Sequence, residues 1–147
     1  MNSTTYVEDT TIKGRKAEID IKVKRIIELL KNEGLDALYL TRQSNFAWIT
    51  AGSTNMVTMC TEAGVASILV TKDGDRYAFT DAVEEPRMKE EQKLEALGFK
   101  LISQAWYENK NKEFIEEIVG GLENVVLVPV WKGVFSHVLF LKNGRMV

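Results

Sequence analysis

The stretch VASILVTKDGDRYAFTD, residues 65–81, decides the fold class of this chain. Two runs rich in β-branched and aromatic residues, 65–71 and 76–80, flank the tetrapeptide KDGD at 72–75. An Asp-Gly pair between two such runs favours the tight turn of a β-hairpin, because glycine readily adopts the positive φ angle of that turn. The sequence therefore predicts two neighbouring antiparallel strands here.

Upstream of the hairpin, the pattern predicts a helix followed by a strand. Between residues 15 and 32 apolar side chains recur with the spacing of one helical face, and Gly34 is placed to end that helix with a left-handed cap. The run LDALYLT, 35–41, has the length of a buried strand. The apolar helical positions are Ile19, Val23, Ile26, Ile27 and Leu30.

The segment SNFAWITAG, residues 44–52, connects this strand to a polar loop and leaves two interpretations open. Ser44 or Asn45 is suited to cap a short helical turn. Alternatively, Trp48 and Ile49 begin an extended segment.

Downstream of the hairpin, the signals alternate between helix and strand. Asp81 has the character of an N-cap, with Glu84 three residues later as in a capping box. Pro86 is tolerated only in a first helical turn, so the predicted helix starts within 82–86 and runs to about Leu97. Three further elements are expected: a strand over 99–102, a helix over 109–119 and a strand over 125–128.

This order predicts a three-layer α/β domain with a mixed sheet of about five strands and helices on its faces. The domain is expected to span residues 15–130. Residues 1–14 are polar and read as a flexible lead-in. Residues 131–147 form an atypical apolar tail, either an extra strand or a truncated linker.

Composition and charge exclude several classes of partner. The chain is 45% hydrophobic and 27% charged, with a net charge of −2 and no dense run of Lys or Arg. Nucleic-acid binding usually needs a basic face, and a membrane span needs a longer apolar run, so we expect neither partner. The single cysteine, Cys60, cannot form an internal disulfide, which favours a reducing, cytoplasmic location.

The scarcity of histidine limits the possible chemistry. One histidine, His137, lies in an apolar strand-like run and is expected to be structural or at the surface. A Cys/His zinc site is excluded because it needs several such ligands, and no phosphate-binding glycine motif is present. Asp36 and Asp81 at strand ends are the residue type of a two-metal nuclease, but a strand entry and a helix cap account for them better.

The aromatic side chains are expected to belong to the core rather than to a recognition surface, although Trp and Tyr still need partners for their polar tips. This group comprises Tyr39, Phe46, Trp48, Trp106 and Tyr107.

The order of these motifs resembles the N-terminal domain of the creatinase, prolidase and Xaa-Pro aminopeptidase family. The matching segments are KVKRIIELLKNEGLDALYLTRQSNFAWITAG and ASILVTKDGDRYAFTDAVEEPRM. Within them, 34–38 corresponds to the family's Gly-containing strand entry. Two departures stand out: Ala51 separates Thr50 from Gly52, and the tail from Trp131 differs from the family's usual linker. The remaining matching positions are Asn45, Trp48, Ile49, Thr50, Gly52, Thr80 and Asp81.

The resemblance implies a ribonuclease-H-like fold and a non-catalytic role in a Xaa-Pro peptidase-like metalloenzyme. Two divalent metal ions and the peptide-cleaving residues are expected only in a C-terminal domain, so this chain carries no catalytic residue and no metal ligand. The implied role is contact within a homodimer and gating of peptide substrates. The alternative is a stand-alone binding or interaction module without peptidase activity. The expected gating residues are Asn45, Trp48, Ser53, Thr54 and Asn55.

Overall fold

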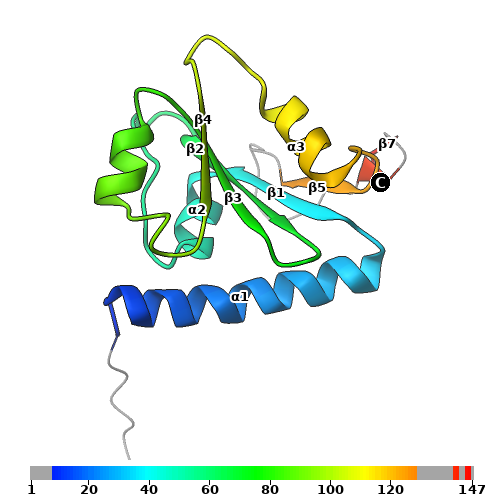
Figure 1. Cartoon of the computed structure of the whole chain (residues 1–147), viewed down its shortest axis with the longest axis horizontal. Coiled ribbons are helices and arrows are strands. Elements are labelled where there is room, and N and C mark those ends of the chain that lie inside the picture. Colours follow the sequence, from blue (N-terminus) through cyan, green and yellow to red (C-terminus); the bar gives the residue numbers. More distant parts are fainter. Residues whose placement is uncertain (1–7, 129–140, 143–144, 147) are drawn as a thin grey trace, which may run out of the picture.

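The computed structural model describes residues 8–128, 141–142 and 145–146 of the 147-residue chain. A five-stranded mixed sheet lies at its centre, with the strand order β4-β3-β2-β1-β5 (Figure 1). Strands β1 and β3 each pair antiparallel with β2, whereas β5 runs parallel to β1 and β4 runs parallel to β3. The strands are β1 (Ala37–Arg42), β2 (Ala63–Thr71), β3 (Arg76–Asp81), β4 (Lys100–Gln104) and β5 (Val125–Val128).

The predicted hairpin is confirmed as the pair β2–β3. Ser67 lies opposite Phe79 and Val70 lies opposite Arg76, and Gly74 in the connecting turn has a φ of +93°. Two short strands, β6 (Leu141–Lys142) and β7 (Arg145–Met146), pair antiparallel as a separate unit. The predictions for His137 and for most of the tail lie outside the described residues.

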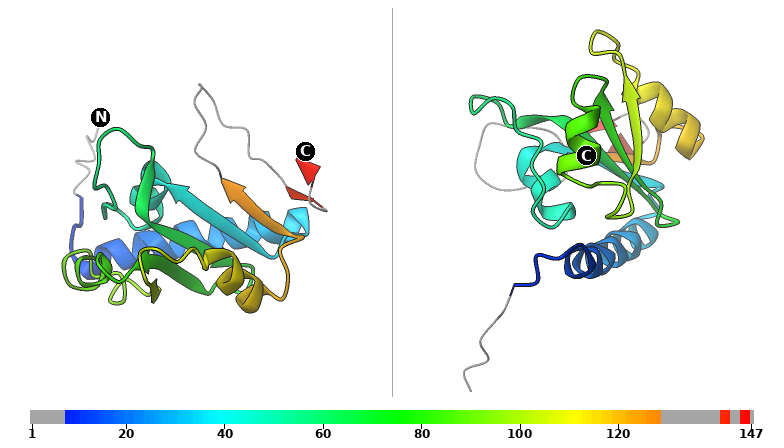
Figure 2. Two further views of the ribbon diagram at one scale, coloured as in Figure 1. Left: turned by 90° about the horizontal axis from the view of Figure 1, so that it is seen from above. Right: turned by 60° about the vertical axis from the view of Figure 1, so that its left-hand side comes forward.

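Helices cover both faces of the sheet and give the predicted three layers (Figures 1 and 2). Helices α1 (Ile12–Glu33) and α2 (Gln43–Ile49) pack on one face together with the π-helical turn η1 (Arg87–Glu91). Helix α3 (Asn111–Val119) covers the other face through Ile115. Among the described residues, none of these helices is long and apolar enough to cross a membrane.

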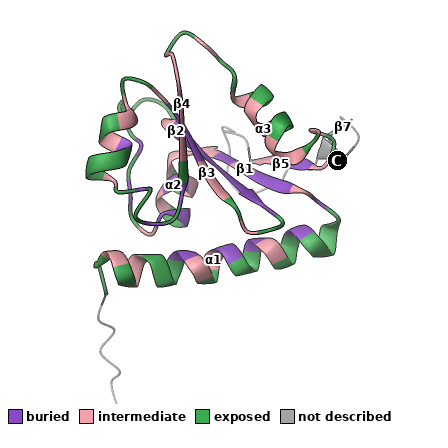
Figure 3. Cartoon of the chain, viewed as in Figure 1, coloured by how far each residue is buried: buried purple, intermediate pink, exposed green. Residues whose placement is uncertain are grey.

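Helix α1 forms as its sequence predicts, although it begins three residues earlier, at Ile12. The hydroxyl of Thr11 accepts a hydrogen bond from the backbone N–H of Gly14 at 3.1 Å, which caps the first turn. Gly34, with a φ of +66°, ends the helix in the left-handed conformation. One face is buried against the sheet (Figure 3), through Ile19, Val23, Ile26 and Leu30.

The predicted helix from 82–86 to Leu97 is wrong in its length. Asp81 does act as a cap, because its Oδ1 accepts the backbone N–H groups of Val83 and Glu84 at 2.8 and 2.9 Å. The chain then makes only η1 and leaves the helical path at Lys93, whose φ is +55°. This irregular path brings four apolar side chains into the core, so packing overrides the local helical signal: Met88, Leu94, Leu97 and Phe99.

The segment 43–49 is helical rather than extended, but neither Ser44 nor Asn45 caps it. The helix follows directly from β1, and the N-cap position is Arg42, which makes no capping bond with its side chain. A side-chain cap is not needed at the first position because the backbone N–H of Gln43 donates to the carbonyl of Glu62 at 2.8 Å.

The aromatic side chains divide between core and surface, so the expectation that they all belong to the core is wrong. Phe46 is fully buried. In contrast, Trp48 is 45% exposed, and Trp106 and Tyr107 are each 73% exposed. The last two occupy the middle of a tight turn closed by the Glu108 N–H and the carbonyl of Ala105.

Candidate gating loop after helix α2

The loop of residues 50–62 joins α2 to β2 and contains three of the five expected gating residues. Its first turn is defined by Thr50, whose N–H and hydroxyl both donate to the carbonyl of Phe46, at 3.0 and 2.6 Å. Ala51 and Gly52 then adopt φ angles of +52° and +102°. These left-handed residues turn the chain away from the helix axis and back across α1.

The side chain of Arg15, on α1, holds this turn in place through hydrogen bonds. Its Nε donates to the carbonyl of Ala51 at 2.9 Å, and its Nη2 donates to the carbonyl of Thr50 at 2.9 Å. The same Nη2 reaches the hydroxyl of Ser53 at 2.6 Å. Because a guanidinium is planar and presents several donors at once, a single side chain satisfies three oxygens of the loop.

Asn55 attaches the middle of the loop to the N-terminal part of β2. Its Nδ2 donates to the carbonyl of Ala66 at 2.5 Å, and its own carbonyl accepts the N–H of Val65 at 3.0 Å. The side chain lies directly on Gly64, where an added Cβ would stand 2.0 Å from the Asn55 amide nitrogen. Glycine is therefore required at position 64 as long as Asn55 occupies this place.

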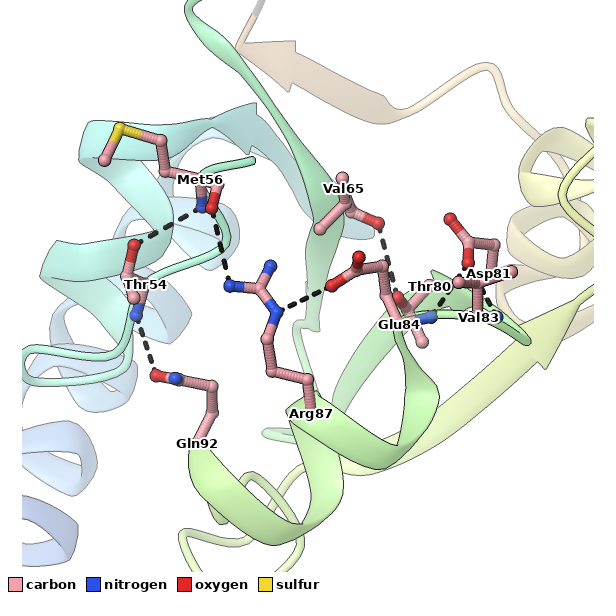
Figure 4. A network of polar contacts seen from close by, with 9 residues as sticks. All are labelled: Thr54, Met56, Val65, Thr80, Asp81, Val83, Glu84, Arg87 and Gln92. Atoms are coloured by element: carbon pink, nitrogen blue, oxygen red, sulfur yellow. Dashed lines mark hydrogen bonds and ion pairs between the residues drawn. The ribbon is translucent and has the colours of Figure 1, made fainter. Parts of the chain in front are cut away.

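The segment around η1 supplies a third attachment (Figure 4). The side chain of Gln92 accepts the backbone N–H of Thr54 at 2.9 Å. Arg87 donates through Nη1 to the carbonyl of Met56 at 3.4 Å and through Nε to the Glu84 carboxylate at 2.6 Å. The irregular chain path at 84–92 thus supplies contacts to the loop in addition to those of Arg15.

The far end of the loop is held by Gln43, the first residue of α2. Its Nε2 donates to the carbonyls of Thr61 and Ala63 at 2.9 and 3.2 Å. With both ends fixed, the tip between them extends into solvent. Its apolar side chains are exposed: Met56 is 44% exposed, Val57 57% and Met59 90%.

The structure places the five expected gating residues in different settings. Ser53 and Asn55 are 2% and 1% exposed, so they position the loop, whereas Thr54 is exposed. Asn45 is half-buried on α2. The partly exposed ring of Trp48 faces α1, where the ammonium of Lys22 lies 5.2 Å from its centroid.

Sequence reasoning missed the residues that hold the loop and those that form its tip. Arg15 and Gln92 are distant in sequence from the loop, and no local pattern connects them to it. The tip did carry a signal, because methionine and valine are uncommon in a turn-rich polar segment. Met56, Val57 and Met59 are the residues that this signal identifies.

The two aspartates considered for a nuclease lie at opposite ends of the sheet. Strands β1 and β3 run in the same direction, and Asp36 precedes the start of β1 whereas Asp81 ends β3. Asp36 pairs with Lys72 at 2.6 Å, and this hydrogen bond lowers the pKa of its carboxyl group. Within the described ranges no three His, Cys, Asp or Glu side chains gather into a group that could hold a metal.

Comparison with protein families gives one match. A family model described as the creatinase/prolidase N-terminal domain matches residues 22–127, which is more than half of the chain. No curated protein matches the chain in sequence.

Comparison with solved structures places the fold among dipeptidases. The fold is similar to that of dipeptidase PepE from Mycobacterium ulcerans, with a TM-score of 0.53 and 13% identity over 72% of this chain and 27% of the other. For a proline dipeptidase from Streptococcus pneumoniae the TM-score is 0.51 and the sequence identity is 18%, over 72% of both chains. For a Xaa-Pro dipeptidase from Bacillus anthracis the TM-score is 0.51 and the sequence identity is 16%, over 69% of this chain. The match spans only 25% of that last enzyme.

Proposed function

This chain belongs to the creatinase/prolidase N-terminal domain family, and we propose that it is the non-catalytic N-terminal domain of a Xaa-Pro peptidase-like metalloenzyme. In this proposal residues 15–130 form the domain, which works in the cytoplasm. Peptide cleavage and two divalent metal ions belong to a separate C-terminal domain. The N-terminal domain contributes contacts within a homodimer and limits which peptides enter the active site.

The observation that supports gating is the contrast within loop 50–62. Its base is held by Arg15 and Gln92 and by the buried side chain of Asn55. Its tip exposes Val57 and Met59. A gate must be held in one place and still present a surface to the substrate, and apolar side chains on a fixed base meet both needs.

The test uses the complete protein, translated from its gene to its own stop codon. It is assayed with Mn²⁺, Co²⁺ or Zn²⁺ on a Xaa-Pro dipeptide and on a longer peptide that begins with Xaa-Pro. The double variant Val57→Ser/Met59→Ser removes the apolar tip without touching the base. We expect kcat/KM for the longer peptide to rise relative to the dipeptide by about tenfold, the scale of a few lost apolar contacts in a specificity site.

Two controls make this result specific. Ile21→Ser changes an apolar side chain that is 55% exposed on α1, and it should leave the ratio of the two substrates unchanged. The 147-residue chain alone should hydrolyse neither peptide with any of the three metals. An unchanged ratio in the loop variant would rule out gating, and turnover by the chain alone would rule out a non-catalytic role.

The second candidate function is a stand-alone binding or interaction module. The observation in its favour is the exposed pair Trp106 and Tyr107, whose rings lie edge to face with centroids 5.7 Å apart. Large exposed aromatic side chains are more frequent at recognition surfaces than on the rest of a protein surface. Complete protein that shows no metal-dependent peptidase activity would favour this module over the gating domain.

A further inference from the structure

A polar pocket of about 260 Å³ opens at the end of the sheet where β1, β3 and β4 finish, on the side that α3 covers. Open α/β sheets commonly bind ligands in the crevice at the carboxyl ends of their parallel strands. The described lining includes the two carboxylates Asp81 and Glu108 and contains no Lys, Arg or His. The pocket shares no lining residue with loop 50–62, so it is separate from the proposed gate.

A chain of hydrogen bonds with a fixed direction runs through the pocket wall. The backbone N–H of Lys110 donates to Oε1 of Gln104 at 2.7 Å, and Nε2 of Gln104 donates to Oδ1 of Asn111 at 2.8 Å. Nδ2 of Asn111 then donates to the hydroxyl of Tyr39 at 3.0 Å, which lies 2.8 Å from the hydroxyl of Ser67. Because a backbone N–H can only donate, it fixes the orientation of both amides.

The orientation of these hydrogen bonds leaves one hydroxyl proton of the Tyr39–Ser67 pair free to bond a ligand in the pocket. Tyr39 and Ser67 have two hydroxyl protons between them, and the hydrogen bond that joins them uses only one. Burial raises the pKa of the Tyr39 phenol, so it stays protonated. Ser67 is 7% exposed and lines the pocket. The wall therefore presents a donor that needs an acceptor, since buried donors are normally paired.

The pocket lining also carries carboxylates and an aromatic ring. Oδ1 of Asp81 already accepts two backbone N–H groups, which leaves Oδ2 for another partner. Glu108 is paired with Lys110 at 2.6 Å, just beyond the lining, so Asp81 contributes the less compensated charge. Trp106, 73% exposed, lines the same pocket. Carboxylates and an indole ring both attract an organic cation and disfavour an anion.

We propose that this pocket binds a small organic cation that also carries a hydrogen-bond acceptor, such as a primary amine next to a carbonyl group. The ammonium lies between the Asp81 carboxylate and the ring of Trp106. In this arrangement the Tyr39 hydroxyl donates to Ser67, and the carbonyl oxygen of the ligand accepts the remaining hydroxyl proton, that of Ser67. A volume of about 260 Å³ has room for several waters, so the pocket suits a small ligand.

L-leucinamide is a probe of this size and chemistry. The chain has three tryptophans, whose indole N–H signals are observed by NMR and assigned with Trp106→Phe and Trp48→Phe. Leucinamide should shift the Trp106 signal in a saturable manner and leave the Trp48 signal in place. 4-Methylpentanamide, which lacks the ammonium, and 3-methylbutylamine, which lacks the carbonyl, should each bind more weakly.

Two variants test the assigned contacts. Asp81→Asn keeps a side chain that can cap the following turn and should weaken both amines. Ser67→Ala removes the hydroxyl donor to the carbonyl of leucinamide, so it should reduce the ratio of leucinamide affinity to 3-methylbutylamine affinity by roughly two- to tenfold, the scale of one hydrogen bond. The Tyr39 hydroxyl does not take its place, because it lies 2.8 Å from the position of the Ser67 hydroxyl. Unmoved Trp48 signals report that each variant is folded.

Three results would overturn the proposal: no saturable shift of the Trp106 signal, an equal shift of the Trp48 signal, or binding of 4-methylpentanamide as tight as that of leucinamide. If Ser67→Ala does not fold, Asp81→Asn and the three probes still decide the question. Neither the readout nor the variants involve peptidase activity, so failure here leaves the gating proposal untouched.

Discussion

Nη2 of Arg15 and the hydroxyl of Ser53 lie 2.6 Å apart, although 38 residues separate them in the sequence. This contact joins the first turns of α1 to the base of loop 50–62. The loop is therefore attached to the longest helix of the domain rather than only to its neighbours in sequence. Its position depends on the packing of α1 against the sheet.

Replacing Arg15 should loosen the loop and destabilise the fold. Arg15→Ala leaves the partly buried carbonyls of Thr50 and Ala51 without their donor, at a cost of about 2 kcal/mol, the usual scale for hydrogen bonds to a charged group. Urea unfolding measures the loss, and hydrogen exchange should show faster exchange at residues 50–55. The control Lys16→Ala changes an exposed neighbour and should alter stability by less than about 0.5 kcal/mol. Equal effects in both variants would contradict the anchoring role.

Ala51→Gly should be neutral or stabilising by up to about 1 kcal/mol. Ala51 has a φ of +52°, where a side chain costs roughly 1–2 kcal/mol, and this relief exceeds or matches the entropy that glycine loses on folding. Ala47→Gly, within α2, should instead destabilise by about 1 kcal/mol. Thermal unfolding of the two variants compares the same chemical change in two backbone conformations, and an equal loss in both would refute the explanation.

Gly64→Ala should be strongly coupled to Asn55. The added methyl group collides with the Asn55 amide, 2.0 Å from the ideal Cβ position, and overpacking of this kind costs about 1–3 kcal/mol. Asn55→Ala removes the obstacle, so the double variant should be more stable than the sum of the two single losses predicts. A double-mutant cycle in urea measures this coupling, and strict additivity would show that the two residues do not depend on each other.

Asp36 should make stability depend on pH at the acidic end. Its hydrogen bond with Lys72 lowers the pKa of its carboxyl group in the folded state. A carboxylate with a lowered pKa stabilises the fold above its unfolded pKa of about 3.9 and loses that effect as pH falls through the folded value. Wild type should exceed Asp36→Asn in unfolding free energy at pH 6, and the gap should close below about pH 4. The pair is partly exposed, so the gap should be about 1 kcal/mol or less; a gap that widens in acid would contradict the assignment.

The chain should self-associate through exposed apolar side chains. Sedimentation velocity at increasing protein concentration should show a dimer, and Met59→Lys, at a position 90% exposed, should weaken it if the loop tip lies in the contact. Lys16→Ala again provides a control. A single monomeric species at high micromolar concentration would contradict association.

Elements whose signals are local were predictable from the sequence. The Asp-Gly turn between 65–71 and 76–80 gave the hairpin because both strands and their turn are contiguous. Helix α1 followed from its apolar face and Gly34. The parallel pairing of β5 with β1 is different in kind, since no local feature of 125–128 specifies its neighbour.

Where prediction failed, tertiary contacts outweighed local preference. Asp81 was recognised as a cap, but the helix behind it gives way to η1 because Met88 and Leu94 must both reach the core. The gating stretch was located from family resemblance. The inward orientation of Ser53 and Asn55 depends on contacts with residues elsewhere in the sequence, such as Arg15 and Ala66. Local patterns in one sequence do not reveal such contacts.

The separation between a fixed base and an open tip has a consequence for how this domain tolerates change. Substitutions at Val57 or Met59 remove little buried surface, so they should change the free energy of unfolding only slightly. Substitutions at Arg15 or Asn55 should lower the stability of the whole domain. Sequence variation can therefore accumulate at the tip with little thermodynamic penalty. A recognition surface built in this way can be retuned for a new partner while the scaffold beneath it stays the same.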